Sequence, residues 1–302
     1  MSATAACGAL NLSFSHATSM IYLLLVSIIW AFSPGLIKGR LTGIDPNAVS
    51  VIRLALALLV FLPFFRPSVI PRTIALRLVA IGTVQFGLMY WGYLHAFTFL
   101  PAYAIGLFTL TTPLYVVLIE ALVTRRWQTR HAFAAVLAIM GAAVLFETRS
   151  GAPSGWLYGC MLVQFSNLCF AAGQLAWRRT RVTLPANISD ASLFALPYAG
   201  ALALTGIFSA FTTDWTAIQP TSTQVLTLLY LGVIASGLSF FLWNLGATRV
   251  ATGTLAVLNN LKVPLTVAVA LLFFGEQTNL PRLAISFVFF TLALFISGRE
   301  TA

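Results

Sequence analysis

Long apolar stretches alternate with short polar connections along the whole chain. Ten stretches approach or exceed the length of a membrane-spanning helix, which needs about 20 apolar residues. They are Met20–Gly39, Ala48–Phe65, Thr73–Thr98, Pro101–Thr124, His131–Glu147, Gly155–Trp177, Ser189–Thr213, Thr223–Thr248, Thr252–Gly275 and Pro281–Gly298. Because every connection is short, no separate soluble domain is expected. The pattern predicts an all-α membrane protein with ten transmembrane helices.

The stretches fall into two similar sets of five. A shift of 151 residues lays Leu94–Leu122 over Leu245–Phe273 and pairs Pro113 with Pro264. Five is an odd number of crossings, so the second copy must insert upside down, as in many secondary transporters. We expect two inverted five-helix repeats around a central cavity. The expected division is a tail at 1–19, a first repeat at 20–149 and a second repeat at 150–302, all within one integral membrane domain.

Charge and composition support this interpretation. The chain is 59% hydrophobic and 8% charged, whereas soluble domains carry about 25% charged residues. If the N-terminus is cytoplasmic, 11 of the 17 Lys and Arg side chains fall on the cytoplasmic side and 4 on the other. This bias predicts cytoplasmic N- and C-termini. It also explains the net charge of +10 without a nucleic-acid partner.

Motifs for other chemistry are missing from the sequence. It has no phosphate-binding loop, no HExxH motif and no CxxC pair among its three cysteines. We therefore expect no cofactor, no metal, no enzymatic activity and no obligatory protein partner. The expected contacts are membrane lipid and a small-molecule substrate.

Polar and aromatic groups deep in the apolar stretches are the candidate substrate-binding residues, because lipid does not solvate them. The third stretch places Tyr90 and Tyr93 on one helical face. An intramembrane ionisable group is a functional candidate by default, and Lys262 is such a group. The predicted lining is Tyr90, Tyr93, Asn244, Asn259, Asn260 and Lys262, with Trp30, Gln164 and Asn167 as second choices.

The two intramembrane cations and the two mid-span prolines need an interpretation. Lys262 has two possible partners, a substrate carboxylate or the carboxylate of Glu120. Arg53 lies near the outer end of its stretch, so we expect it to reach the interface and to be structural. Pro113 and Pro264 predict kinks that adjust gating helices.

Several short patterns, in order, resemble the drug/metabolite transporter superfamily, EamA type. They are Trp30 with Pro34-Gly35 and Lys38, Pro46 with Arg53, Ala102-Tyr103-Ala104 before Pro113, and Pro264 before Gly275-Glu276. One departure is Arg125, which stands in the first half where Glu276 stands in the second. The resemblance implies an alternating-access transporter. The aromatic-rich third stretch is most similar to bacterial exporters of amino acids, including aromatic ones.

Other functions stay open. A nucleotide-sugar or triose-phosphate antiporter of the same superfamily needs paired buried cations, which Lys262 alone does not supply. An intramembrane lipid-modifying enzyme needs a reactive cluster, but His95 and His131 fall on opposite sides of the predicted membrane. A non-transporting membrane scaffold is a third alternative, and it predicts no water-accessible interior.

Overall fold

The computed structural model describes residues 3–125, 129–145, 155–185, 187–248 and 252–298. In a few helical stretches, 3–20 and 252–261 among them, only the backbone is described. All regular structure in these ranges is helical, which confirms the all-α prediction. The α-helices are α1 (Ala3–Arg40), α2 (Pro46–Phe61), α3 (Arg72–Gly82), α4 (Met89–Phe99), α5 (Ala102–Phe108), α6 (Thr112–Thr124), α7 (Thr129–Leu145), α8 (Trp156–Val182), α9 (Asp190–Thr212), α10 (Ser222–Leu229), α11 (Ser239–Ala247), α12 (Thr252–Phe273) and α13 (Leu280–Gly298).

Tighter and wider helical turns separate some of these helices. Four short 3₁₀ segments are described, namely η1 (Leu62–Phe64), η2 (Pro67–Val69), η4 (Thr109–Thr111) and η5 (Trp215–Ala217). Two π-helical segments are η3 (Thr83–Leu88) and η6 (Tyr230–Leu238). Segment η3 joins α3 to α4, and η6 joins α10 to α11, so each lies inside one continuous membrane-length helix. Such π-helical turns are rare and are frequently found at functional sites.

Six helices in the described ranges are long and apolar enough to cross a membrane. They cover Ile21–Arg40, Pro46–Phe64, Arg72–Phe99, Ala102–Thr124, Asp190–Thr212 and Ser222–Ala247. Lys262–Phe273 and Leu280–Ala293 are shorter apolar helices. The chain is therefore a multi-pass membrane protein. The arrangement of ten spans in two repeats stays a prediction.

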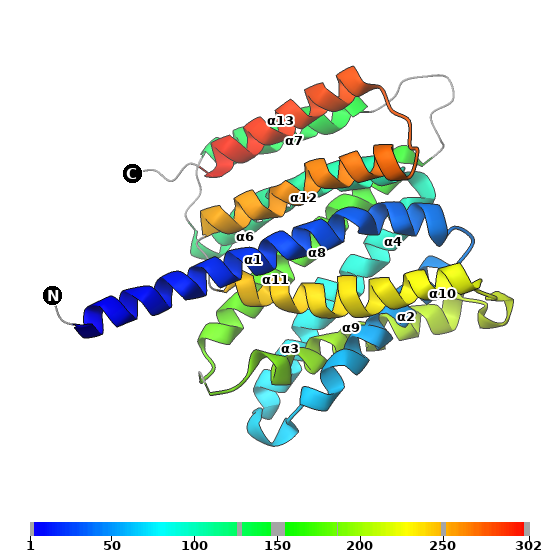
Figure 1. Ribbon diagram of the computed structural model, residues 1–302. Coiled ribbons are helices and arrows are strands. Elements are labelled where there is room, and N and C mark those ends of the chain that lie inside the picture. Colours follow the sequence, from blue (N-terminus) through cyan, green and yellow to red (C-terminus); the bar gives the residue numbers. More distant parts are fainter. Residues whose placement is uncertain (1–2, 126–128, 146–154, 186, 249–251, 299–302) are drawn as a thin grey trace.

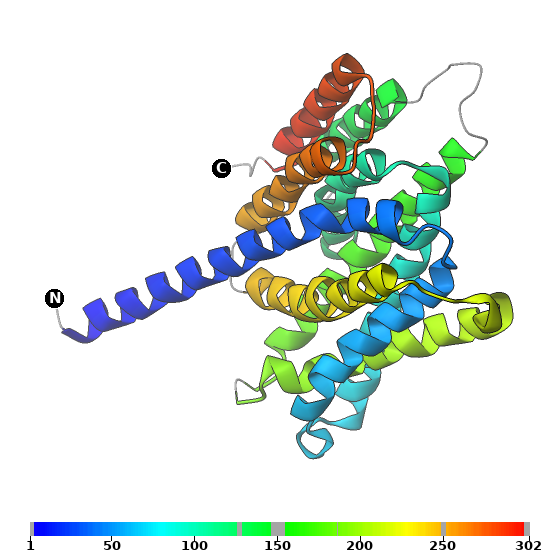
Figure 2. The ribbon, with the colours of Figure 1, turned by 45° about the vertical axis from the view of Figure 1, so that its right-hand side comes forward.

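The helices form one bundle in which early and late parts of the chain interlock. Helix α1 packs on α11 and α12, α2 on α9, α4 on α8, and α7 on α13. Figure 1 shows α7 and α13 side by side at one edge of the bundle. The N-terminal part of α1 extends beyond the other helices in both views (Figure 1, Figure 2). A cavity between these helices is thus bounded by residues far apart in the sequence.

Glycines allow the closest approach between two of the helices. A Cβ atom on Gly82 would overlap the backbone of Pro197, and one on Gly200 would overlap the carbonyl of Val79. Helices α3 and α9 therefore pack almost backbone to backbone, as small residues permit in membrane bundles. This contact anchors η3, which begins directly after Gly82.

Candidate functional site

A cavity lies between α1, α2, α4, α8, α11, α12 and the interrupted α5–α6 helix. It holds about 680 Å³ of empty space, a volume that includes the space at its opening. The lining residues are Trp30, Ser33, Pro34, Arg53, Met89, Tyr90, Tyr93, Gly106, Thr109, Thr112, Ser166, Asn167, Phe170, Phe240, Lys262 and Thr266. Two of these described lining residues are cations and none is acidic. The wall is therefore suited to an anion.

The π-helical segment η6 binds two of the side chains that line the cavity, Trp30 and Arg53. Backbone carbonyls in a membrane protein must find partners within the protein or in water. The indole N–H of Trp30 donates to the carbonyl of Ala235 at 2.8 Å. The Tyr198 hydroxyl donates to the carbonyls of Ser236 and Gly237, at 2.7 and 3.0 Å. These bonds satisfy three successive carbonyls of η6 and hold the Trp30 ring against the cavity, as the sequence predicted for this side chain.

Arg53 does not reach the interface as the sequence suggested. It is only 3% exposed and lines the cavity. Its Nη2 donates to the Tyr90 hydroxyl at 2.7 Å and its Nε to Ser236 Oγ at 3.2 Å. Ser236 Oγ donates its own hydrogen to the carbonyl of Leu231 at 2.6 Å. Tyr90 must therefore be the donor in its 2.7 Å bond with Ser236. Arg53 is held inside the protein because η6 presents Ser236 to it.

Lys262 contacts the cavity through aromatic faces. Its Nζ lies 5.1 Å from the ring centroid of Trp30, 5.9 Å from that of Trp243 and 6.0 Å from that of Phe170. Cation–π attraction contributes about 0.5–2 kcal/mol, depending on desolvation. Within the described part of the chain, this ammonium group has no hydrogen bond or ion pair. Its hydrogens are thus available for a ligand.

The alternative partner of Lys262 is engaged elsewhere. Glu120 forms an ion pair with Arg179 at 2.8 Å, and the two side chains are 48% and 44% exposed. The suggestion that Glu120 pairs with Lys262 is therefore wrong for this structure. Exposed pairs of this kind contribute about 0–1 kcal/mol, so the Glu120 pair is not a strong determinant of the fold.

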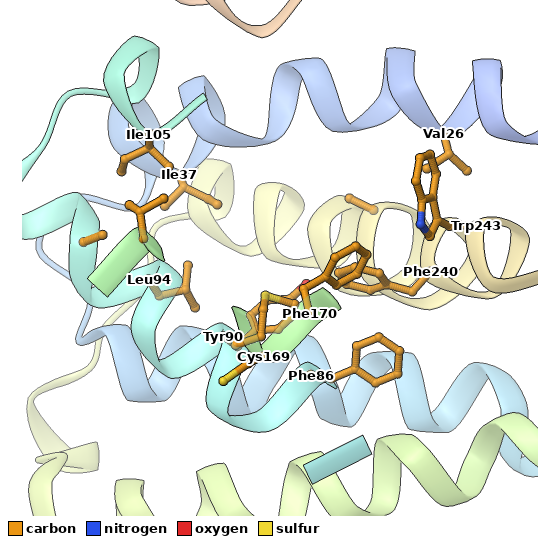
Figure 3. Packing of buried hydrophobic residues seen from close by; sticks show 14 of the residues in the cluster. Val26, Ile37, Phe86, Tyr90, Leu94, Ile105, Cys169, Phe170, Phe240 and Trp243 are labelled. Atoms are coloured by element: carbon orange, nitrogen blue, oxygen red, sulfur yellow. The ribbon is translucent and has the colours of Figure 1, made fainter. Parts of the chain in front are cut away.

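The tyrosines predicted from the third stretch both line the cavity. Tyr90 is buried and bonded to Arg53, whereas Tyr93 is partly buried and its ring meets Phe97 edge to face at 5.2 Å. Figure 3 shows Tyr90 on α4 close to Phe170 on α8 and Phe240 on α11. Phe240 lies 6.0 Å from Tyr90 and 5.9 Å from Phe170 between ring centroids.

Asn244 does not line the cavity, although it was a first choice for the lining. It is fully buried, and its Oδ1 accepts a hydrogen bond of 3.1 Å from Gln85 Nε2. Its own amide donates to the carbonyl of Phe240 at 2.9 Å. The amide pair links α11 to η3. Asn244 therefore joins two helices, the alternative role of a buried amide in a membrane.

Asn167 and Gln164 on α8 support the break before Pro113. Proline cannot donate a backbone hydrogen bond, and the chain passes through η4 before α6 begins. Asn167 Nδ2 donates to the Phe108 carbonyl at 2.9 Å and to Thr111 Oγ1 at 3.0 Å. Thr111 Oγ1 also contacts Gln164 Oε1 at 2.6 Å. Asn167 lines the cavity, whereas Gln164 is absent from its wall.

The second proline behaves differently. Pro264 lies inside the unbroken helix α12 and is exposed on the bundle surface. The predicted pair of kinks is thus not symmetric in this structure, and gating by either proline stays a prediction. The side chains of Asn259 and Asn260 lie outside the described residues, so their predicted role is also untested.

Glu276 and Lys38, which both belong to the short patterns noted in the sequence, bind backbone groups beside the connection between α4 and α5. Glu276 accepts hydrogen bonds from the backbone N–H groups of Ala102 at 2.7 Å and Tyr103 at 2.8 Å. These groups start α5, where a carboxylate is favoured by the helix dipole. Lys38 Nζ donates to the Phe97 carbonyl at 2.6 Å, in the last turn of α4. The α4–α5 connection is therefore held from both sides.

Comparison with known proteins identifies the family. A model of the EamA-like transporter family matches residues 17–147. The "Biotin transporter" of Salmonella typhimurium is 37% identical over 265 residues, covering 87% of each chain. The "Probable biotin transporter" of Pseudomonas aeruginosa is 35% identical over 280 residues, covering 92% of this chain and 97% of that one. The chain belongs to the EamA-like transporter family.

This membership confirms the resemblance seen in the sequence and makes the protein a small-molecule transporter of the drug/metabolite transporter superfamily. A third relative, the "Biotin transporter" of Escherichia coli (strain K12), is 35% identical over 265 residues, 87% of each chain. A solved crystal structure that is 16% identical aligns with a TM-score of 0.62 over 93% of this chain and 96% of the other. That likeness concerns the fold alone. None of these relatives is named as a transporter of amino acids.

For this EamA-family chain, the main residue that sequence reasoning misplaced is Arg53. A signal was present, since Arg53 belongs to one of the family-type patterns together with Pro46. The partner that holds it, Ser236, lies 183 residues away. The sequence alone does not show that contact.

Proposed function

We propose that the protein carries a small monocarboxylate of the biotin type across the bacterial inner membrane, with Lys262 binding the carboxylate. The observation that carries this proposal is the cavity wall, which holds Lys262 and Arg53 without an acidic residue among its described members. A carboxylate supplies the anion that these two cations otherwise lack, and charge-assisted hydrogen bonds to it are strong. The names of the three relatives favour biotin over other monocarboxylates.

Amino-acid export, the expectation from the sequence, has less support. A free amino acid is a zwitterion, and its ammonium group needs hydrogen-bond acceptors and, ideally, a carboxylate. The described lining offers hydroxyls and the Asn167 amide but no carboxylate. A zwitterion leaves both positive charges of the cavity wall without net compensation, whereas a monocarboxylate compensates one of them, and uncompensated charge is costly in a low-dielectric site.

A phosphorylated substrate gains one argument from the structure, since Arg53 adds a second buried cation. However, the two cations contact different rings. Arg53 Cζ lies 4.5 Å from the Tyr90 centroid, whereas Lys262 faces Trp30, and Phe240 contacts both of these rings. Cations that contact different rings suit two separate polar groups better than one phosphate.

The proposed machinery is alternating access by two inverted repeats, 20–149 and 150–302, with both termini cytoplasmic and export as the direction implied by the family resemblance. The two π-helical segments support the repeat. With the 151-residue shift found in the sequence, η3 falls on 234–239 and overlaps η6. Pro113 and Pro264 are the proposed gating positions. A reporter fused after Ala302 tests the topology, and an external signal contradicts it.

Reconstitution in liposomes tests the substrate. Vesicles loaded with unlabelled biotin are diluted into labelled biotin, and counterflow is compared with empty liposomes. Parallel vesicles contain unlabelled tryptophan or an unlabelled sugar phosphate. Each is diluted into labelled biotin and, separately, into the labelled form of its own content. We expect accumulation of labelled biotin only with its own counter-substrate. Counterflow of tryptophan or sugar phosphate without that of biotin overturns the proposal.

A further inference from the structure

Arg53 keeps an unsatisfied donor in the middle of the bundle. A guanidinium group has five N–H donors and no acceptor. Nε and Nη2 bind Ser236 and Tyr90. Nη1 is buried and has no hydrogen-bond partner in the described part of the chain. Leaving a buried donor of a charged group unsatisfied is costly, so this atom calls for an explanation.

The donors already in use limit what a ligand can offer. Carboxylates prefer to accept two parallel N–H bonds from one edge of the guanidinium group. The Nε–Nη2 edge is occupied by two hydroxyl oxygens, those of Ser236 and Tyr90. Nη1 keeps two N–H groups and Nη2 keeps one, so this end of the guanidinium group can donate to an acceptor such as a carbonyl oxygen. With the single carboxylate of the substrate at Lys262, the acceptor left for Arg53 is uncharged. The hydroxyl chain from Tyr90 through Ser236 to the Leu231 carbonyl fixes the orientation of the guanidinium group.

Aromatic rings link the surroundings of this donor to those of the proposed carboxylate site. Phe240 lies 5.0 Å from Trp30, which faces Lys262, and 6.0 Å from Tyr90, which binds Arg53. A substrate that meets both cations has its middle part beside Phe240 and Phe170. The two lining rings provide an apolar surface for that middle part.

We infer that Arg53 forms a second subsite, which binds the uncharged carbonyl oxygen at the end of the substrate opposite its carboxylate. This inference rests on the proposed function, since it takes Lys262 as the carboxylate site. Its substrate class is an elongated monocarboxylate with an apolar middle and a urea- or amide-type carbonyl at the far end. Biotin has these three parts. Tyr90 and Ser236 are positioning residues that orient Arg53.

The test compares two competitors that differ only at the far end. One is biotin, and the other is the analogue in which a positively charged guanidine replaces the cyclic urea. Half-inhibitory concentrations against labelled biotin are measured in proteoliposomes. We expect the wild type to prefer the urea, and Arg53→Gln to lower that preference about tenfold, the size of one hydrogen bond to a charged group. Lys262→Gln weakens both competitors by a similar factor and keeps the preference.

The outcomes separate the two proposals. If the wild type carries no biotin, the proposed function fails. If it carries biotin but Arg53→Gln keeps the full preference for urea, the Arg53 subsite fails alone. A short dicarboxylate that competes better than biotin also contradicts the subsite, because it requires a second anion at Arg53. If Arg53→Gln does not elute as a monodisperse protein, Tyr90→Phe takes its place. It removes only the orienting hydroxyl, so an unchanged preference in that variant also refutes the inference.

Discussion

Replacing Lys262 by methionine removes one of the two positive charges of the cavity wall while nearly keeping the shape of the side chain. Methionine packs well against aromatic rings, and the wall around Lys262 consists of Trp30, Trp243 and Phe170. We therefore expect normal expression and folding. The variant loses the group that we propose to bind the substrate carboxylate.

The expected effect follows from the burial of the site. Two unit charges about 4 Å apart attract by about 4 kcal/mol at an effective dielectric constant near 20. Desolvation of both groups removes part of this, and hydrogen bonds to charged groups contribute about 1.5–3 kcal/mol net. Since about 1.4 kcal/mol changes affinity tenfold, Lys262→Met is expected to weaken biotin competition by about 10- to 100-fold.

Competition in proteoliposomes measures this effect, using biotin and its methyl ester as unlabelled competitors. The wild type should prefer the free acid, and Lys262→Met should bind both with similar affinity. Arg179→Gln is the matched control, since it removes a cation whose ion pair with Glu120 lies half-exposed. An unchanged preference for the free acid in Lys262→Met, with the variant folded, refutes carboxylate binding at this position.

Three structural predictions are checked by thermal unfolding of purified variants in detergent. Glu276→Gln loses one oxygen acceptor at the start of α5 and should lower the free energy of unfolding by about 1–2 kcal/mol. An unchanged midpoint of thermal unfolding contradicts a stabilising role for these two hydrogen bonds. Gly82→Ala should destabilise by about 1–3 kcal/mol because its Cβ overlaps the Pro197 backbone. The control Gly206→Ala, where a Cβ meets nothing within 4 Å, should be neutral or stabilising, and equal losses in both variants argue against the close helix contact. Tyr198→Phe leaves two carbonyls of η6 without their donor and should cost about 1–3 kcal/mol; wild-type stability would show that these carbonyls find other partners.

The general features of the site were predictable because a bilayer imposes few solutions. An ionisable group about ten residues from either helix end must face the protein interior, so Lys262 was found from its depth alone. Tyr90 and Tyr93 were found because three-residue spacing puts two polar-tipped rings on one face. These arguments use distances along a single helix, which the sequence contains directly.

The positions of Arg53 and Asn244 depend on contacts with other helices, which the sequence of a single helix does not show. Arg53 lies only seven positions after Pro46, the first residue of α2, so reaching the interface was a reasonable expectation. It stays inside because a π-helical turn in η6, 183 residues away, presents Ser236 to it. Hydrophobic periodicity does not indicate such a turn.

Asn244 is absent from the cavity wall for a related reason, since its amide is already satisfied by Gln85. A buried polar side chain binds substrate only where the protein leaves it unsatisfied, and that depends on partners from other helices. Within the described part of the cavity wall, the Lys262 ammonium, Nη1 of Arg53 and the Ser33 hydroxyl have no hydrogen-bond partner, and the two cationic donors among them define the charge of the predicted substrate.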